Sequence, residues 1–150
     1  MVRKVRNGQQ IPLLLICTIL TALLATPPVV HAQGEGQSIE VTVDITPELR
    51  SKAKPDQAVF VFAKGIKGPR APLAAVKVKV ADLPTTVTLD DSRSKPMFKF
   101  SRHKKVRVFA RVSQSGGALK SRGDFEGVSP VIKLNKVGKP ITVTIDYIVP

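Results

Sequence analysis

The sequence predicts an all-β protein that folds as an antiparallel sandwich of about seven or eight short strands. Three observations carry this prediction. Apolar and polar residues alternate in several short stretches, which is the pattern of strands buried on one face. Glycine, proline and aspartate separate these stretches at the spacing of hairpin turns. After residue 38, no long stretch shows the periodicity of a helix.

The first 32 residues are predicted to be a secretory signal peptide that does not belong to the fold. Three basic residues precede an apolar run over residues 11–24, and Ala32 ends the segment with the small residues of a cleavage site. The apolar run is shorter than the roughly 20 residues that cross a bilayer as a helix. We therefore expect cleavage after Ala32 and export to the periplasm. An uncleaved N-terminal anchor is the alternative.

The rest of the chain is expected to be a flexible lead-in over residues 33–37 and one β-sandwich domain over residues 38–150. Without the three basic residues of the signal, 21 Lys and Arg remain against 11 Asp and Glu, a net charge of +10. Such a charge favours an anionic partner, and export argues against nucleic acid. Because Cys17 lies inside the signal, we expect neither a disulfide nor a thiolate metal site in the domain.

The strands are predicted from their apolar patterns. Ile39 to Ile45 alternates, and a short helix is expected after it with Thr46 as its N-cap. The continuous apolar run over residues 58–63 predicts a central strand that is covered on both faces. Further strands are expected over residues 76–80, 85–89, 105–112, 128–134 and 141–149. Pro130 places the strand over 128–134 at an edge, and residues 119–126 could be a loop or a short edge segment.

The domain offers few groups for catalysis. Its single histidine, His103, lies among basic residues and is expected to be solvated. Asp90 and Asp91 are expected to be turn residues that bind their own backbone. Met97 and His103 leave open a two-ligand copper site, although a blue-copper site would need cysteine. We predict no enzyme activity, no cofactor and no metal, with a small exported enzyme or metal carrier as a minor alternative.

The most distinctive feature is a basic stretch over residues 93–111. Its cations are interleaved with phenylalanines, as expected of a docking surface for an anionic partner with apolar anchors. The same composition also suits a solvated loop and strand face that keeps a small domain soluble, and both interpretations stay open. The candidate interaction patch consists of Arg93, Lys95, Phe98, Lys99, Phe100, Arg102, Lys104, Lys105, Arg107 and Arg111.

Several blocks of the sequence, taken in order, resemble a known family. The blocks are IEVTVD at 39–44, VFVFAK at 59–64, PLAAV at 72–76, DLP at 82–84, TVTLDDS at 86–92, ARVSQSG at 110–116 and GDFEG at 123–127. Their order and spacing resemble the C-terminal periplasmic domain of cytochrome c-type biogenesis protein H, also called CycH or CcmI. The resemblance extends from about Ser38 to Val149.

The resemblance implies an immunoglobulin-like sandwich in the periplasm that works with apocytochrome c and the haem ligation machinery. Proteins of that family carry membrane helices and a tetratricopeptide region ahead of this domain, and apocytochrome binding is tied mostly to those repeats. This sequence contains no such repeat and no haem-attachment motif. We therefore expect a periplasmic accessory protein that acts by protein–protein contact in cytochrome c assembly. The alternative is a module that binds an anionic envelope surface, lipid or polysaccharide, through the basic 93–111 region.

Overall fold

The computed structural model describes residues 37–68 and 71–150, so the predicted signal peptide and most of the predicted lead-in lie outside the described residues. The strands are β1 (Ile39–Ile45), β2 (Ala58–Gly65), β3 (Ala74–Lys79), β4 (Thr85–Leu89), β5 (Lys105–Val112), β6 (Phe125–Val128), β7 (Ile132–Lys133), β8 (Ile141–Ile145) and β9 (Tyr147–Ile148). The helical segments are α1 (Pro47–Arg50) and four 3-10 turns at Val80–Asp82, Asp91–Arg93, Phe100–Arg102 and Leu134–Lys136.

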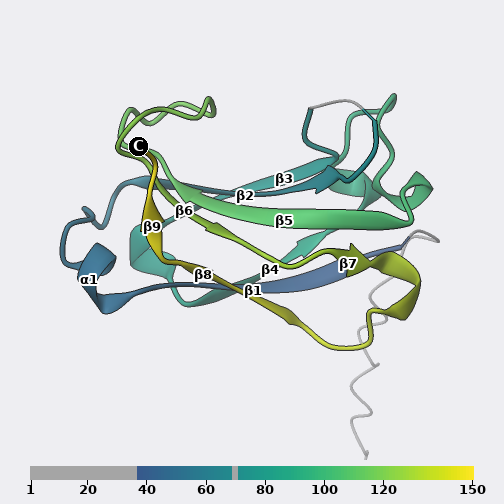
Figure 1. Cartoon of the computed structure of the whole chain (residues 1–150), viewed down its shortest axis with the longest axis horizontal. Coiled ribbons are helices and arrows are strands. Elements are labelled where there is room, and N and C mark those ends of the chain that lie inside the picture. Colours follow the sequence, from purple (N-terminus) through teal and green to yellow (C-terminus); the bar gives the residue numbers. More distant parts are fainter. Residues whose placement is uncertain (1–36, 69–70) are drawn as a thin grey trace, which may run out of the picture. The chain divides into compact units, whose positions relative to one another are not determined.

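Two sheets pack face to face, which confirms the predicted all-β sandwich (Figure 1). The larger sheet has the strand order β3-β2-β5-β6-β9, and β7 pairs with β5 beside this path. The smaller sheet has the order β4-β1-β8. No helix among residues 37–68 and 71–150 is long and apolar enough to cross a membrane.

The core lies between the sheets and is built mainly from branched aliphatic side chains. Val43 of β1, Val61 of β2 and Val108 of β5 are each 0% exposed. Such residues suit a pleated, buried surface, and alternation places every second one on the inner face. Phe100, from the 3-10 turn ahead of β5, adds a large ring to the same core.

The smaller sheet departs from a wholly antiparallel arrangement. β1 pairs antiparallel with β4, but it pairs in parallel with β8, where Val43 lies opposite Val143. The outer side of this sheet is hydroxyl-rich, and the hydroxyl groups of Thr42 and Thr86 lie 2.9 Å apart. Alternation within a strand does not reveal the direction of its neighbour, so the parallel pair was not expected.

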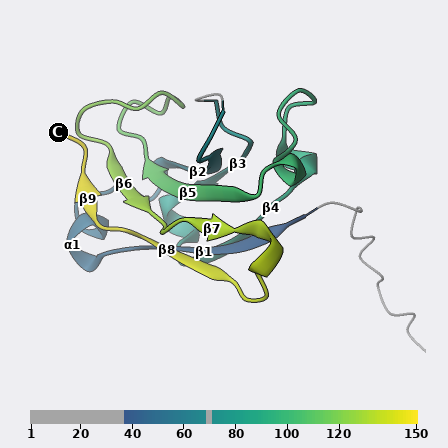
Figure 2. The same ribbon diagram turned by 45° about the vertical axis from the view of Figure 1, so that its right-hand side comes forward.

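The strand predicted over residues 141–149 is divided between the two sheets. Its first part is β8 in the smaller sheet, and its second part is β9, which pairs with β6 in the larger sheet. Figure 2 shows the yellow end of the chain rising from the lower layer to the upper one. At the crossing, the amide of Asp146 donates a hydrogen bond of 3.3 Å to the carbonyl oxygen of Glu126.

The strand predicted over residues 128–134 is also divided, because Pro130 has no amide hydrogen to donate. β6 ends at Val128 and β7 begins at Ile132. Between them, the Ser129 hydroxyl accepts a hydrogen bond of 2.9 Å from the amide of Val108. β7, the strand within the predicted range, pairs with β5 alone, as expected of an edge, whereas β6, which contains only Val128 of that range, lies between β5 and β9. Residues 119–126, which could have been a loop or an edge segment, are a loop up to Asp124, and Phe125 and Glu126 begin β6.

Two local expectations also need correction. Thr46 does precede α1, but its side chain makes no capping hydrogen bond, and its amide donates instead to the carbonyl oxygen of Ile145 at 3.0 Å. β2 is central, as predicted, but another sheet covers only its inner face. On its other side, Phe60 remains half-buried.

Candidate functional site

The outer side of the larger sheet carries an ordered set of aromatic and cationic side chains. In one row across the strands, Lys77, Phe60 and Arg111 are register partners. In the next row, Ala75, Phe62, Phe109 and Val128 form an apolar series. We use the name outer face for Lys77, Lys79, Phe60, Ala75, Phe62, Phe109, Val128, Lys64, Arg107, Lys105 and Lys133.

Aromatic rings on the outer face hold cations in place. The rings of Phe62 and Phe109 stack with their centroids 5.4 Å apart and their planes at 9°. The Lys64 ammonium lies 5.3 Å from both centroids, and the Lys77 ammonium lies 5.6 Å from the Phe60 centroid. Each placement is a cation–π contact, which restricts the ammonium group without neutralising its charge.

Two pairs of like charges lie directly opposite each other on this face. Lys64 of β2 is the register partner of Arg107 of β5, and Lys105 of β5 is the partner of Lys133 of β7. Directly opposed like charges destabilise a sheet. In the part of the chain that the structure describes, no carboxylate lies within 4.0 Å of these four cations. Their charge is therefore available to an anionic ligand.

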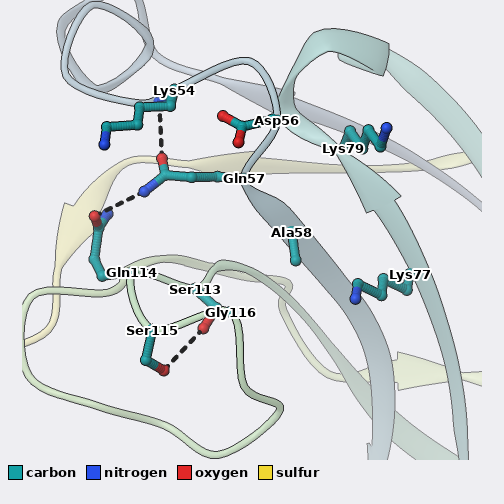
Figure 3. Close-up of a pocket in the computed structure, with 10 residues that line it drawn as sticks. All are labelled: Lys54, Asp56, Gln57, Ala58, Lys77, Lys79, Ser113, Gln114, Ser115 and Gly116. Carbon is teal, nitrogen blue, oxygen red and sulfur yellow. Dashed lines mark hydrogen bonds between the residues drawn. The ribbon is translucent and has the colours of Figure 1, made fainter.

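A hollow lies at each end of the outer face. Lys64, Arg107 and Phe109 line one of about 290 Å³, together with Ile66 and Val131, which are 45% and 43% exposed. The other hollow, of about 410 Å³, lies at the far end of β3 (Figure 3). Its lining residues are Lys54, Asp56, Gln57, Ala58, Lys77, Lys79, Ser113, Gln114, Ser115 and Gly116.

The second hollow is bounded by three lysines and one carboxylate. The side-chain amide of Gln57 donates to that of Gln114 at 2.9 Å, and its oxygen accepts from the Lys54 amide at 2.8 Å. Figure 3 shows Lys77 and Lys79 projecting from one strand on the side opposite Gln114. These groups suit an anion that also accepts or donates hydrogen bonds.

A buried ionic cluster closes one side of the outer face. Arg111 is 4% exposed, and its guanidinium lies 3.5 Å from Asp124 and 4.0 Å from Glu126. The same guanidinium donates to the carbonyl oxygen of Ala118 and lies 5.5 Å from the Phe62 centroid. Asp124 also accepts hydrogen bonds from backbone amides of the connecting loop. The cluster therefore anchors the loop between β5 and β6.

Glu126 receives two further partners from outside the strand pair. The Lys120 ammonium donates to its carboxylate at 2.8 Å, and the Tyr147 hydroxyl donates to the same oxygen. Burial, the hydrogen bond to Glu126 and the negative charges nearby raise the pKa of Tyr147 to about 12. Tyr147 therefore stays protonated throughout the physiological range and remains a hydrogen-bond donor.

Comparison with known proteins assigns this sandwich to a family. The family model described as the cytochrome c-type biogenesis protein H Ig-like domain matches residues 39–146. The chain belongs to this family. A curated relative, cytochrome c-type biogenesis protein CycH of Pseudomonas aeruginosa, is 41% identical over 96 residues. The match covers 63% of this chain but only 24% of the relative. No solved structure matches the chain.

The family assignment confirms the resemblance found in the sequence, and the structure sorts the residues of the candidate patch. Lys105 and Arg107 lie on the outer face, and Phe98 is half-buried against the core. The other exposed cations of the candidate patch lie on the segment between β4 and β5. They are Arg93, Lys95, Lys99, Arg102 and Lys104.

Two members of the predicted patch need correction. Phe100 is 0% exposed and belongs to the core, because its 3-10 turn directs the ring inward. Arg111 is buried because Ala118, Asp124 and Glu126 surround its guanidinium. Neither side chain contributes to an exposed docking surface.

Of the acidic pair after β4, Asp90 binds its own turn as predicted, whereas Asp91 binds a residue ten positions later. Asp90 accepts a hydrogen bond from the Ser92 amide at 2.9 Å, and Asp91 accepts from the amide and the hydroxyl of Ser101. Burial raises the pKa of Asp91, but the hydrogen bonds from Ser101 lower it more, so it lies below the usual value. Both carboxylates therefore hold the 90–104 segment in shape.

The two candidate copper ligands lie in different environments. Met97 is 82% exposed. His103 is half-buried, not solvated as expected, because its ring packs on Gly65 so closely that a Cβ there would lie 2.8 Å from Nδ1. Among residues 37–68 and 71–150, no three His, Cys, Asp or Glu residues cluster as a metal site would require.

The sequence interpretation missed the half of the outer face that β2 and β3 supply. Phe60 and Phe62 were included in an apolar run expected to be covered on both faces. A signal was present, because Phe alternates with Val and Ala in this run while Lys77 and Lys79 alternate with Val in the next strand. Aromatic and cationic residues at period two indicate an amphipathic outer side.

Proposed function

We propose that this chain is a periplasmic accessory protein in the maturation of c-type cytochromes, and that it acts by protein–protein contact. The family match over residues 39–146 supports the process. The outer face supports the mode of action, since it presents unneutralised cations around an apolar centre. The opposed pair Lys64 and Arg107 is the observation on which this proposal mainly rests.

Contact, not catalysis, suits the chemistry of this face. Ammonium and guanidinium groups bind carboxylates, and exposed apolar side chains pack against those of a partner. We place the partner among the proteins of cytochrome c assembly, apocytochrome c or the haem ligation machinery. This choice follows the name of the Pseudomonas aeruginosa relative, a cytochrome c-type biogenesis protein. The predicted signal over residues 1–32 would bring the domain to the periplasm, where that assembly takes place.

The test is complementation of a deletion strain, with c-type cytochrome content measured by haem staining. The face variant combines Lys64→Gln with Arg107→Gln, and the matched control combines Lys95→Gln with Lys99→Gln on the segment between β4 and β5. Both pairs remove two exposed or half-exposed positive charges. We expect the control to restore cytochrome content and the face variant to fail at equal protein level. Normal content in the deletion strain, or equal effects of the two pairs, would overturn the proposal.

A second candidate function is binding to an anionic envelope surface, and a specific observation favours it. The segment between β4 and β5 exposes Arg93, Lys95, Lys99, Arg102 and Lys104. Met97 protrudes from the same segment with 82% exposure. Sedimentation with anionic and neutral vesicles tests this function. Binding to anionic vesicles that weakens at high salt supports it, whereas equal binding to both kinds of vesicle contradicts it.

A further inference from the structure

The two ends of the outer face are alike in charge and differ from its middle. One end has Lys64 and Arg107, the other has Lys77 and Lys79, and Phe62 with Phe109 lies between them. We infer that this face binds an acidic segment of a partner protein, with carboxylates at both ends of an apolar stretch. This inference rests on the proposed function and specifies the chemistry of the partner.

The first end calls for a carboxylate because its cations repel each other. Lys64 and Arg107 are direct register partners, and Lys105 and Lys133 repeat the arrangement in the adjacent row. A like-charged pair costs stability in the free protein. A bound carboxylate would remove this repulsion while forming charge-assisted hydrogen bonds. The hollow of about 290 Å³ beside Lys64 gives such a group room to enter.

The middle of the face is apolar and recessed. The register row of Ala75, Phe62, Phe109 and Val128 contains no charged side chain. Phe62 is 6% exposed, so its ring forms a floor and does not protrude. The Lys64 ammonium lies over Phe62 and Phe109. The apolar surface that a partner can reach is therefore made by Ala75, Val128 and the exposed part of Phe109.

The second end provides cations from a neighbouring strand. Lys77 and Lys79 line the hollow of about 410 Å³ together with Lys54 (Figure 3). Asp56 is the carboxylate among its lining residues, so positive charge predominates there. Along β2, the rows of Lys77 and Lys79 lie four and six residues from the row of Lys64. At 3.3 Å per residue, these backbone rows are about 13–20 Å apart, and carboxylates bound at Arg107, in the row of Lys64, and at Lys79 would be separated by a distance of this order.

A lipid bilayer fits this arrangement less well than a protein segment. Binding at a membrane interface uses apolar side chains that protrude and insert between lipids. Here the central rings lie against the sheet, and the Lys64 ammonium lies over both of them. Positive charge at two separated ends also matches two discrete carboxylates better than a continuous layer of headgroups.

Binding of synthetic peptides to the full chain tests the inference, with fluorescence anisotropy as the readout. One peptide carries two glutamates at each end of a four-residue apolar centre, and its isomer carries all four glutamates at one end. We expect the two-ended peptide to bind about tenfold more tightly, because only it reaches both groups of cations. Equal affinities, or no binding of the two-ended peptide, would overturn the inference.

Neutralising pairs locate the binding on the protein. Lys64→Gln with Arg107→Gln removes one end, and Lys77→Gln with Lys79→Gln removes the other. Each pair of substitutions should raise the Kd for the two-ended peptide about tenfold. The control pair, Lys95→Gln with Lys99→Gln, should change this Kd less than about twofold. An equal loss in the control pair would indicate an effect of overall charge and contradict the inference.

Two further measurements separate the possible failures. Vesicles of anionic phospholipid test the membrane alternative. If the protein binds these vesicles but neither peptide, and if neutralising either pair of cations on the outer face abolishes vesicle binding, the face binds lipid instead. Cytochrome content in the complemented strain tests the proposed function independently. If that content depends on Lys64 and Arg107 while the peptides do not bind, the proposed function stands and the inference fails.

Discussion

Gly127 of β6 and Thr144 of β8 touch backbone to backbone, although their strands belong to different sheets. A Cβ on Gly127 would overlap the Thr144 carbonyl group, with 2.6 Å to its carbon, and would lie 2.9 Å from the Cα of Ile145. No side-chain rotation can relieve such a clash, because the neighbouring atoms are backbone. The absence of a side chain at Gly127 therefore sets the separation of these two strands.

We predict that Gly127→Ala destabilises the fold by about 3 kcal/mol, the upper part of the usual cost of overpacking. Urea unfolding monitored by circular dichroism measures this change. Gly138→Ala is the matched control, because a Cβ at Gly138 meets nothing within 4 Å. The control should change the free energy of unfolding by less than about 0.5 kcal/mol. A neutral Gly127→Ala would show that the two strands are not in backbone contact.

Arg111→Met is predicted to destabilise the protein by about 3–5 kcal/mol. The substitution leaves Asp124 and Glu126 buried with one cation fewer, and an uncompensated buried charge is costly. Arg107→Met on the same strand and the same side is the control. Because Arg107 is exposed and faces Lys64, its loss should not reduce stability. Similar losses in both variants would contradict the buried cluster.

The titration of Tyr147 can be followed without interference, since the chain has one tyrosine and no tryptophan. Its pKa of about 12 lies above the ordinary value of 10.0. The protonated phenol therefore stabilises the fold below pH 10, and this contribution is lost as the pH rises towards 12. Tyrosinate absorbance measures the pKa.

Two substitutions separate the causes of this shift in the pKa of Tyr147. Glu126→Gln removes a hydrogen-bonded negative charge and should lower the pKa markedly, although burial still raises it. Asp146→Asn removes a weaker electrostatic influence and should lower the pKa less. A tyrosine that titrates near 10 in the folded protein would rule out the bond to Glu126.

Phe100→Ala is predicted to cost about 3–5 kcal/mol, the usual range for a large ring removed from a core. Thermal or urea unfolding gives the value, and Met97→Ala, at an exposed position of the same segment, should be nearly neutral. Under conditions where the Phe100→Ala variant remains folded, its Kd for the two-ended peptide should be unchanged. Lost binding with unchanged stability would instead make Phe100 a surface anchor.

Strands with one buried face were predictable because burial imposes a period of two on the sequence. Ile39 to Ile45 is the example, with all four aliphatic residues inward and Glu40 exposed. The same reasoning found β5, where buried Val106 and Val108 alternate with exposed Lys105 and Arg107. In such segments, the local pattern and the packing agree.

Features that depend on distant partners were not predictable. The alternation of apolar residues continues through Asp146, so it gives no sign that β8 and β9 join different sheets. That division depends on Glu126, which accepts from the Asp146 amide and pairs with Tyr147. Burial of Arg111 likewise depends on Ala118 and Asp124, which belong to a later loop.

The candidate site was half predictable for the same reason. Arg107 stood out because cations are dense around it in the sequence. Lys64 did not, because its importance comes from lying opposite Arg107 and above Phe62 and Phe109. Pairing between β2 and β5 creates that arrangement, and no single segment contains it.

The passage from β8 to β9 has a mechanical consequence. The continuous backbone of β8 and β9 links the two sheets, since β8 is hydrogen-bonded to β1 and β9 is hydrogen-bonded to β6. Neither sheet can separate at this end unless the strand hydrogen bonds of the other sheet break as well. Amides of β6 and β8 should therefore exchange with solvent in one concerted opening, at the rate of the whole domain rather than that of a frayed edge.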